Sequence, residues 1–191
     1  MQGNDDLSMS GLPPANGTDD RGARPLVWVA AFTKSNAERT AAAALRREDY
    51  SVYIPSRREL RQWSDRKKWV EVLLIPRVIF IHTIPQKLND LLRNPAITSL
   101  LKAPGERKPA VIPASEMEKL MFMAGNSDRT IEISAPRILR GEEVEIVRGS
   151  LKGLRGRASQ DADGLRRISI LIDNLCCASV SVPLSDLEAI T

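Results

Sequence analysis

The sequence predicts an α+β protein in two parts: a first domain that mixes strands with helices, and a second, smaller domain made of strands alone. In the first part an apolar run, a segment with helical periodicity and a second apolar run follow one another, which indicates a β-α-β opening. From Ile138 onward, short runs of alternating apolar residues are separated by turn residues, which indicates a small β-barrel.

The composition is that of a soluble globular protein, with 42% apolar and 27% charged residues in a chain of 191. The net charge of +4, from 28 Lys and Arg against 24 Asp and Glu, favours an acidic partner such as nucleic acid. We see no signal-peptide pattern and no run of the ~18 apolar residues that a membrane span needs, so we expect a cytoplasmic protein without a membrane partner.

The first domain is expected at residues 25–125, after a tail at 1–24 that is rich in Gly, Asn, Asp, Ser and Pro and is predicted to be disordered. Its first helix should begin at a capping box, in which Ser35 and Glu38 bond each other's backbone amides. The expected elements are strands at 26–32, 51–55, 69–74, 78–83 and 97–101, and helices at about 35–48, 85–93 and 113–125.

Residues 57–68, RRELRQWSDRKK, are the most basic stretch, and we interpret them as a polar loop between two strands. Six cations stand there against Glu59 and Asp65. Trp63 and Trp69 lie within or beside this charge, a combination that suits phosphate contact with some stacking on a base or sugar. The alternative is a solvated connecting loop that binds nothing. The candidate nucleic-acid-binding residues are Arg57, Arg58, Arg61, Trp63, Arg66, Lys67, Lys68 and, further along, Arg77.

An interdomain linker is expected at 126–136, because this segment is polar and has no helical period. The second domain then occupies 137–191. Its strands are expected at 143–148, 154–160, 166–173, 177–182 and 187–190.

The sequence shows no catalytic constellation. His82, the single histidine, stands in an apolar strand and is expected to be a structural residue with its hydrogen bonds satisfied. Cys176 and Cys177 are expected to be reduced strand residues, and two thiols with one histidine cannot form a structural zinc site. The glycine-rich segment 149–156 lacks the Gly-Lys-Ser/Thr ending of a phosphate-binding loop. We therefore expect no enzymatic activity, metal or cofactor.

Two motifs resemble one known family. The β-α-β opening, the basic stretch and LLIPRVIF resemble the N-terminal domain of NusG-type transcription elongation factors. Within that family, RQWSDRKKWVEVLLIPRVIFIHT looks most like the UpxY-type paralogs of capsular polysaccharide operons. VEIVRGSLKGLRGRA, followed by VPLSDLEAI, resembles a KOW motif, in which Lys152, Gly153 and Gly156 shape a turn that asks for positive φ or close backbone approach. The resemblance covers about residues 25–191.

The resemblance implies an α/β sandwich with a four-stranded, mainly antiparallel sheet, joined to an SH3-like five-stranded barrel. It also implies that an apolar face of the first domain docks on the clamp helices of RNA polymerase, with the basic stretch over DNA or RNA near the transcription bubble. The face carried over by motif consists of Trp28, Ile75, Pro76, Val78 and Phe80.

This chain departs from the family at two positions of this face, Ile75 and Val78, and at the neighbouring Arg77. Family members commonly have an aromatic residue at Ile75, Gly or Asn at Arg77 and Tyr at Val78. Docking here would therefore rest on aliphatic packing, with Arg77 meeting an acidic clamp residue or DNA. The KOW barrel is expected to bind a ribosomal protein, a termination factor or its own first domain. It should be stable as a barrel, because Ile168, Ile170 and other β-branched residues favour strands.

The favoured function is a non-enzymatic elongation factor that suppresses pausing and termination, as an antiterminator of particular operons. A KOW-type RNA-binding protein of the translation apparatus is the alternative, although an apolar docking face would be idle on a ribosome. An enzyme acting on nucleic acid is disfavoured by the lack of paired carboxylates, metal ligands and a nucleophile.

Overall fold

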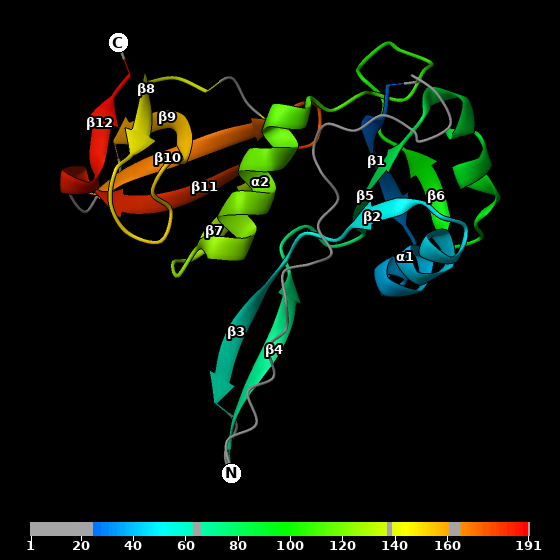
Figure 1. Ribbon diagram of the computed structural model, residues 1–191, viewed down its shortest axis with the longest axis horizontal. Coiled ribbons are helices and arrows are strands. Elements are labelled where there is room, and N and C mark those ends of the chain that lie inside the picture. Colours follow the sequence, from blue (N-terminus) through cyan, green and yellow to red (C-terminus); the bar gives the residue numbers. More distant parts are fainter. Residues whose placement is uncertain (1–24, 63–65, 137–138, 161–164, 191) are drawn as a thin grey trace.

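The computed structural model describes residues 25–62, 66–136, 139–160 and 165–190 (Figure 1). The tail predicted at 1–24 lies outside these residues, as does Trp63. In chain order the elements are β1 (Val27–Thr33), α1 (Glu38–Arg47), β2 (Ser51–Tyr53), β3 (Ser56–Gln62), β4 (Lys67–Leu73), β5 (Val78–Thr83), η1 (Pro85–Lys87), η2 (Asp90–Arg93), β6 (Ile97–Leu100), α2 (Ala114–Asn126), β7 (Ile131–Ser134), β8 (Glu142–Ile146), β9 (Arg155–Gln160), β10 (Leu165–Ile172), β11 (Cys176–Pro183), η3 (Leu184–Asp186) and β12 (Leu187–Ala189).

The first sheet has four strands in the order β2-β5-β1-β6, and every neighbouring pair is antiparallel. One face packs against α1, where Ala41 and Leu45 meet Val29 and Ile81 of the sheet. The small alanines of α1 let the helix approach the sheet closely. The four-stranded antiparallel sheet with helices, which the resemblance implies, is confirmed.

Helix α2 covers the other face of this sheet and also contacts the second sheet (Figure 1). Its buried residues Met117, Leu120 and Met123 belong to one apolar cluster that runs from Trp28 in β1 to Ile168 in β10. The helix predicted at about 113–125 is therefore confirmed, and its buried side chains are core. Because α2 packs on both sheets, the two halves of the chain share a continuous core.

The second sheet has six antiparallel strands in the order β12-β8-β9-β10-β11-β7. The five strands predicted from sequence are all present, and a sixth, β7, comes from the segment predicted as a linker. Ile131 pairs with Val180 and Ile133 with Ala178. Ile131 and Ile133 alternate with Glu132 and Ser134, as in a strand. This alternation covers only four residues, so it is not recognisable among the polar residues around it.

Three local predictions are wrong. Residues 57–68 are not a loop, because most of them pair as the hairpin of β3 and β4. The segment after Pro85 forms two 3-10 turns instead of a helix, and it leaves Leu92 exposed while Leu91 is buried. Helix α1 has no side-chain cap, because Glu38 bonds a distant turn instead of its own helix start. Tertiary contacts override the local signal in each case.

Candidate nucleic-acid and polymerase interface

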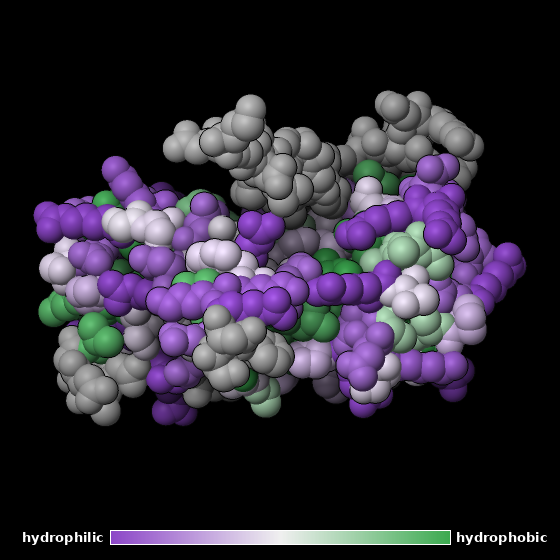
Figure 2. Space-filling view, turned by 90° about the horizontal axis from the view of Figure 1, so that it is seen from below, coloured by the Kyte–Doolittle hydropathy of each residue, from purple (hydrophilic) through white to green (hydrophobic). Residues whose placement is uncertain are grey.

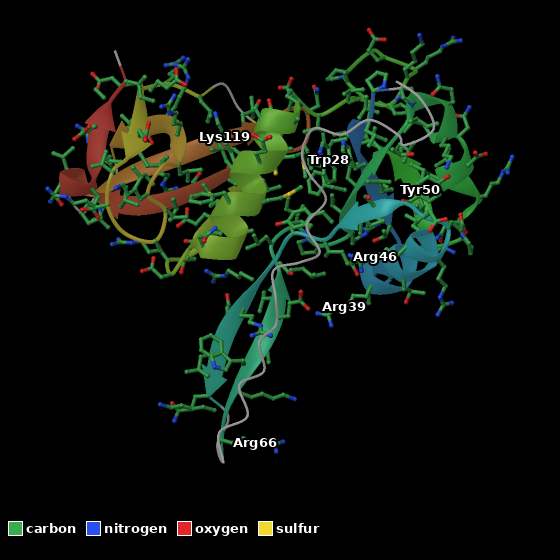
Figure 3. All side chains as sticks on the ribbon, viewed as in Figure 1. Trp28, Arg39, Arg46, Tyr50, Arg66 and Lys119 are labelled. Atoms are coloured by element: carbon green, nitrogen blue, oxygen red, sulfur yellow. The ribbon has the colours of Figure 1, made fainter. Side chains whose placement is uncertain are left out.

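The hairpin of β3 and β4 extends away from the rest of the protein, and Arg66 lies near its far end (Figures 1 and 3). Its root is fixed by backbone hydrogen bonds, including Leu74 N to Pro55 O at 2.8 Å. In the register Leu60 stands opposite Trp69, and Arg58 stands opposite Glu71. Directly opposed residues lie on the same face of a hairpin, so these four side chains share one face.

The hairpin cations that were predicted to bind nucleic acid fall into two groups. Arg58, Arg66, Lys67 and Lys68 are exposed. Arg57 has a side chain only 18% exposed, pairs with Glu59 and donates to the carbonyl of Arg129 at 3.1 Å. It therefore fastens the root of the hairpin to the segment after α2. The side chain of Arg61 lies outside the described part of the structure.

Viewed from the side on which the hairpin projects, hydrophilic surface runs across the middle of the molecule, with smaller hydrophobic areas beside it (Figure 2). A hydrophilic surface of this kind suits a polar partner, a class that includes nucleic acid.

The turn between β4 and β5 holds Pro76 and Arg77, both exposed. Arg77 has φ of 64°, in the left-handed region that favours Gly or Asn. Its N–H donates to Oε1 of Glu38 at 2.7 Å, and its carbonyl accepts from Thr33 N at 2.8 Å. Glu38 is buried and belongs to this site, although its place near Ser35 suggested a helix cap. Nothing in the local sequence points to its distant partner.

The five residues predicted to bind polymerase do not form an open face in this structure. Pro76 is exposed, whereas the remaining four, Trp28, Ile75, Val78 and Phe80, are buried in the cluster that α2 completes. Trp28 stacks on His82 with ring centroids 4.5 Å apart. His82 is buried, but the prediction that its hydrogen bonds are satisfied is wrong, because its buried Nε2 has no partner among the described residues. Burial lowers the pKa of His82.

The predicted KOW turn follows β8. Gly153 has φ of 92° and donates to the carbonyl of Ile146 at 2.7 Å. At Gly156 a Cβ would lie 2.8 Å from the Ser169 carbonyl oxygen, so this position needs glycine for close approach. Lys152 is exposed beside a pocket of about 260 Å³ that α2 and this turn line together.

Among the described residues, no group of three or more His, Cys, Asp and Glu side chains could hold a metal ion. Cys176 and Cys177 are free and buried, as predicted. Burial, with a smaller contribution from Cys177, raises the pKa of Cys176 to about 12, so this thiol stays protonated and unreactive. None of the helices in the described chain has the length and apolar character to cross a membrane.

Comparisons with known proteins give one family match. The profile of the family described as "Transcription termination factor nusG" matches residues 26–121. No curated protein matches the chain in sequence.

Two solved structures are similar at low identity. One, described as "Domain interaction in Thermotoga maritima NusG", is 17% identical, covers 87% of this chain and 98% of that chain, and gives a TM-score of 0.49. The other is the MjSpt4:Spt5 complex in conformation B, which is 15% identical, covers 86% of this chain and 97% of that chain, and gives a TM-score of 0.29.

Proposed function

This chain belongs to the NusG family of transcription factors, which are not enzymes, and we propose that it docks on RNA polymerase as an elongation factor that suppresses pausing and termination. The observation that carries the proposal is the cationic hairpin, which projects from the domain that the family profile matches (Figure 1). A docked domain would hold such a hairpin near DNA or RNA at the transcription bubble, where it needs little affinity of its own.

We place the polymerase contact at the exposed turn of Pro76 and Arg77. The buried residues Trp28, Ile75, Val78 and Phe80 would support this turn from beneath, with α2 remaining in place. The Glu38 carboxylate fixes the turn through the Arg77 amide, so the surface offered to the clamp helices is preorganised. Arg77 then presents a cation to an acidic clamp residue or to DNA.

The proposed mechanism is linkage. A protein that binds the elongating state of the polymerase better than the paused state enriches the elongating state. The hairpin cations would add to this preference by contacting the upstream fork or the displaced strand, which favours reannealing behind the bubble. Pausing and termination then decline without any covalent step.

Restriction to particular operons, those of capsular polysaccharide synthesis, is a further part of the proposal. Its support is the likeness of RQWSDRKKWVEVLLIPRVIFIHT to the UpxY-type paralogs. The second sheet, with its KOW-like turn, would bind a ribosomal protein or a termination factor.

Co-purification of the tagged protein from its cells tests the proposal. Polymerase subunits are the expected partners, whereas ribosomal subunits without polymerase would favour the translation alternative. Pro76→Asp places a charge in the proposed interface and should reduce the recovered polymerase at least tenfold, because a desolvated unpaired charge is costly. Pro104→Asp, at another exposed turn proline, is the matched control. Equal recovery with both variants would show that the turn is not the contact.

A further inference from the structure

The hairpin carries the most exposed aromatic side chain of the described residues. Trp69 is 62% exposed, and Leu60, its direct cross-strand neighbour, is 49% exposed. β3 and β4 form a sheet of two strands, and no third strand from the described part of the chain extends this face. An indole backed by an aliphatic side chain forms a flat apolar platform on a hairpin that otherwise carries charge.

The charges around this platform are positive. Lys67 precedes Trp69 by two residues on the same face, and Arg58 precedes Leu60 by two, which places each about 7 Å along its strand. The remaining charge of this face, Glu71, pairs with Arg39 at 2.7 Å and accepts from Ser56. Arg39 therefore offsets the negative charge of Glu71, which leaves Lys67 and Arg58 as the cations beside the platform.

A groove of about 630 Å³ lies beside the platform at the root of the hairpin. Trp69, Arg58 and the paired Glu71 line it, and at the end of α2 the methyl group of Ala124 and the bare backbone of Gly125 leave it open. Its volume falls within the ~300–1,000 Å³ of ordinary ligand pockets. The groove therefore has room for one nucleotide beside the indole, and Arg58 is the cation of its lining that stands on the same hairpin face as Trp69.

We propose that Trp69, backed by Leu60, stacks on one unpaired base of a single strand, while Arg58 and Lys67 contact the adjoining phosphates. This rests on the proposed function, adds a stacking residue to it and narrows its nucleic-acid partner to a single strand. Single-stranded nucleic acid is the occupant that fits, because a duplex hides its base faces while its phosphates satisfy only the cations. Every base has a π face, so binding at this position tolerates any sequence.

Tryptophan fluorescence can isolate this contact. In a Trp63→Phe protein the remaining tryptophans are the buried Trp28 and the exposed Trp69. A dodecamer of thymidine, titrated at low salt, should quench the fluorescence of this protein. A matched thymidine–adenosine duplex should quench it much less. Adding Trp69→Phe should remove the quenching.

Affinity is measured by anisotropy of the labelled dodecamer. Trp69→Phe keeps an aromatic ring and should stay within about threefold of the parent, whereas Trp69→Ala should weaken binding by about fivefold to a hundredfold. Leu184→Ala, at an exposed leucine of η3 between β11 and β12, is the control and should change nothing.

Three results would overturn the inference: equal dodecamer affinity for Trp69→Ala and its parent, equal affinity for single strand and duplex, or no binding of the dodecamer by the parent. Polymerase co-purification is run in parallel and judges the proposed function separately. If Trp69→Ala loses polymerase but keeps the dodecamer, the platform binds protein and the inference is wrong, while docking on polymerase stands.

Discussion

The buried carboxylate of Glu38, at the first residue of α1, accepts a hydrogen bond from the backbone N–H of Arg77 at 2.7 Å. These residues are 39 positions apart, and their contact fastens the β4–β5 turn to the start of a helix on the same sheet. The turn is thereby held in a left-handed conformation that an arginine rarely adopts. Local structure at α1 and the geometry of the proposed polymerase contact thus depend on one side chain.

Glu38→Ala is expected to destabilise the protein by about 1–3 kcal/mol, because the Arg77 amide loses its partner in a partly buried site. Glu38→Gln keeps an acceptor oxygen and should cost less. Urea unfolding followed by circular dichroism measures both. If both variants have the same free energy of unfolding as the parent, the hydrogen bond does not hold the turn.

Arg77→Gly tests the turn from the other side. Glycine removes the strain of about 1 kcal/mol that a side chain carries at positive φ, although its freer unfolded chain offsets part of the gain. We expect the free energy of unfolding to stay equal or to rise slightly. If Arg77 also supplies the proposed cation, the same variant should reduce read-through of a terminator in transcription assays. A marked loss of stability would contradict the assigned backbone strain.

The sequence predicted the fold better than it predicted the site. Strands β1, β5 and β10 follow from apolar runs and alternation, and α2 follows from its methionine and leucine spacing. Most of β4 was predicted as the strand at 69–74, but its partner β3 was missed, because charged residues such as Arg57 and Glu59 alternate along it in place of apolar ones. A polar two-stranded ribbon and a polar loop look alike in a single sequence.

The buried state of Trp28 and Phe80 could not be inferred from the motif that contains them. An apolar strand residue can face a covering helix or a partner, and only the tertiary arrangement decides between them. In this structure α2 takes that place. The role of Glu38 depends on a contact 39 residues away, and the platform at Trp69 depends on the hairpin register, so neither leaves a local sequence signal.

Leu120→Ala should lower the denaturant concentration at which both halves of the chain unfold. Leu120 is fully buried in the cluster that α2 shares with the two sheets, and the cavity left behind costs about 2–5 kcal/mol. Leu92→Ala, at an exposed leucine, should cost little and serves as the control. The continuous core also predicts one cooperative transition. Separate transitions for the two halves would show that α2 does not couple them.

Stability should fall in acid because of His82. Burial lowers the pKa of His82 below its ordinary value of 6.5, so the unfolded chain binds a proton more readily than the folded one. Stability is therefore complete above pH 6.5 and declines as pH falls from there towards the folded pKa. His82→Phe should flatten unfolding free energies measured between pH 7.5 and about 5. An unchanged slope in this variant would assign the acid sensitivity to another group.

Removing the exposed hairpin cations should reduce both salt-dependent binding and read-through. A variant with Arg58, Lys67 and Lys68 changed to Ala loses three phosphate contacts. The slope of log K against log salt for a single strand should then fall by about 2, since each contact contributes roughly 0.7. Polymerase recovery should stay near the parent value, because the proposed docking turn lies elsewhere. The matched control removes Lys34, Arg47 and Lys108, which are also exposed and lie outside the hairpin.

In vitro transcription across a terminator then decides the role of the charge. Read-through equal to the parent would mean that the hairpin cations are only solvated, and that docking alone accounts for the activity.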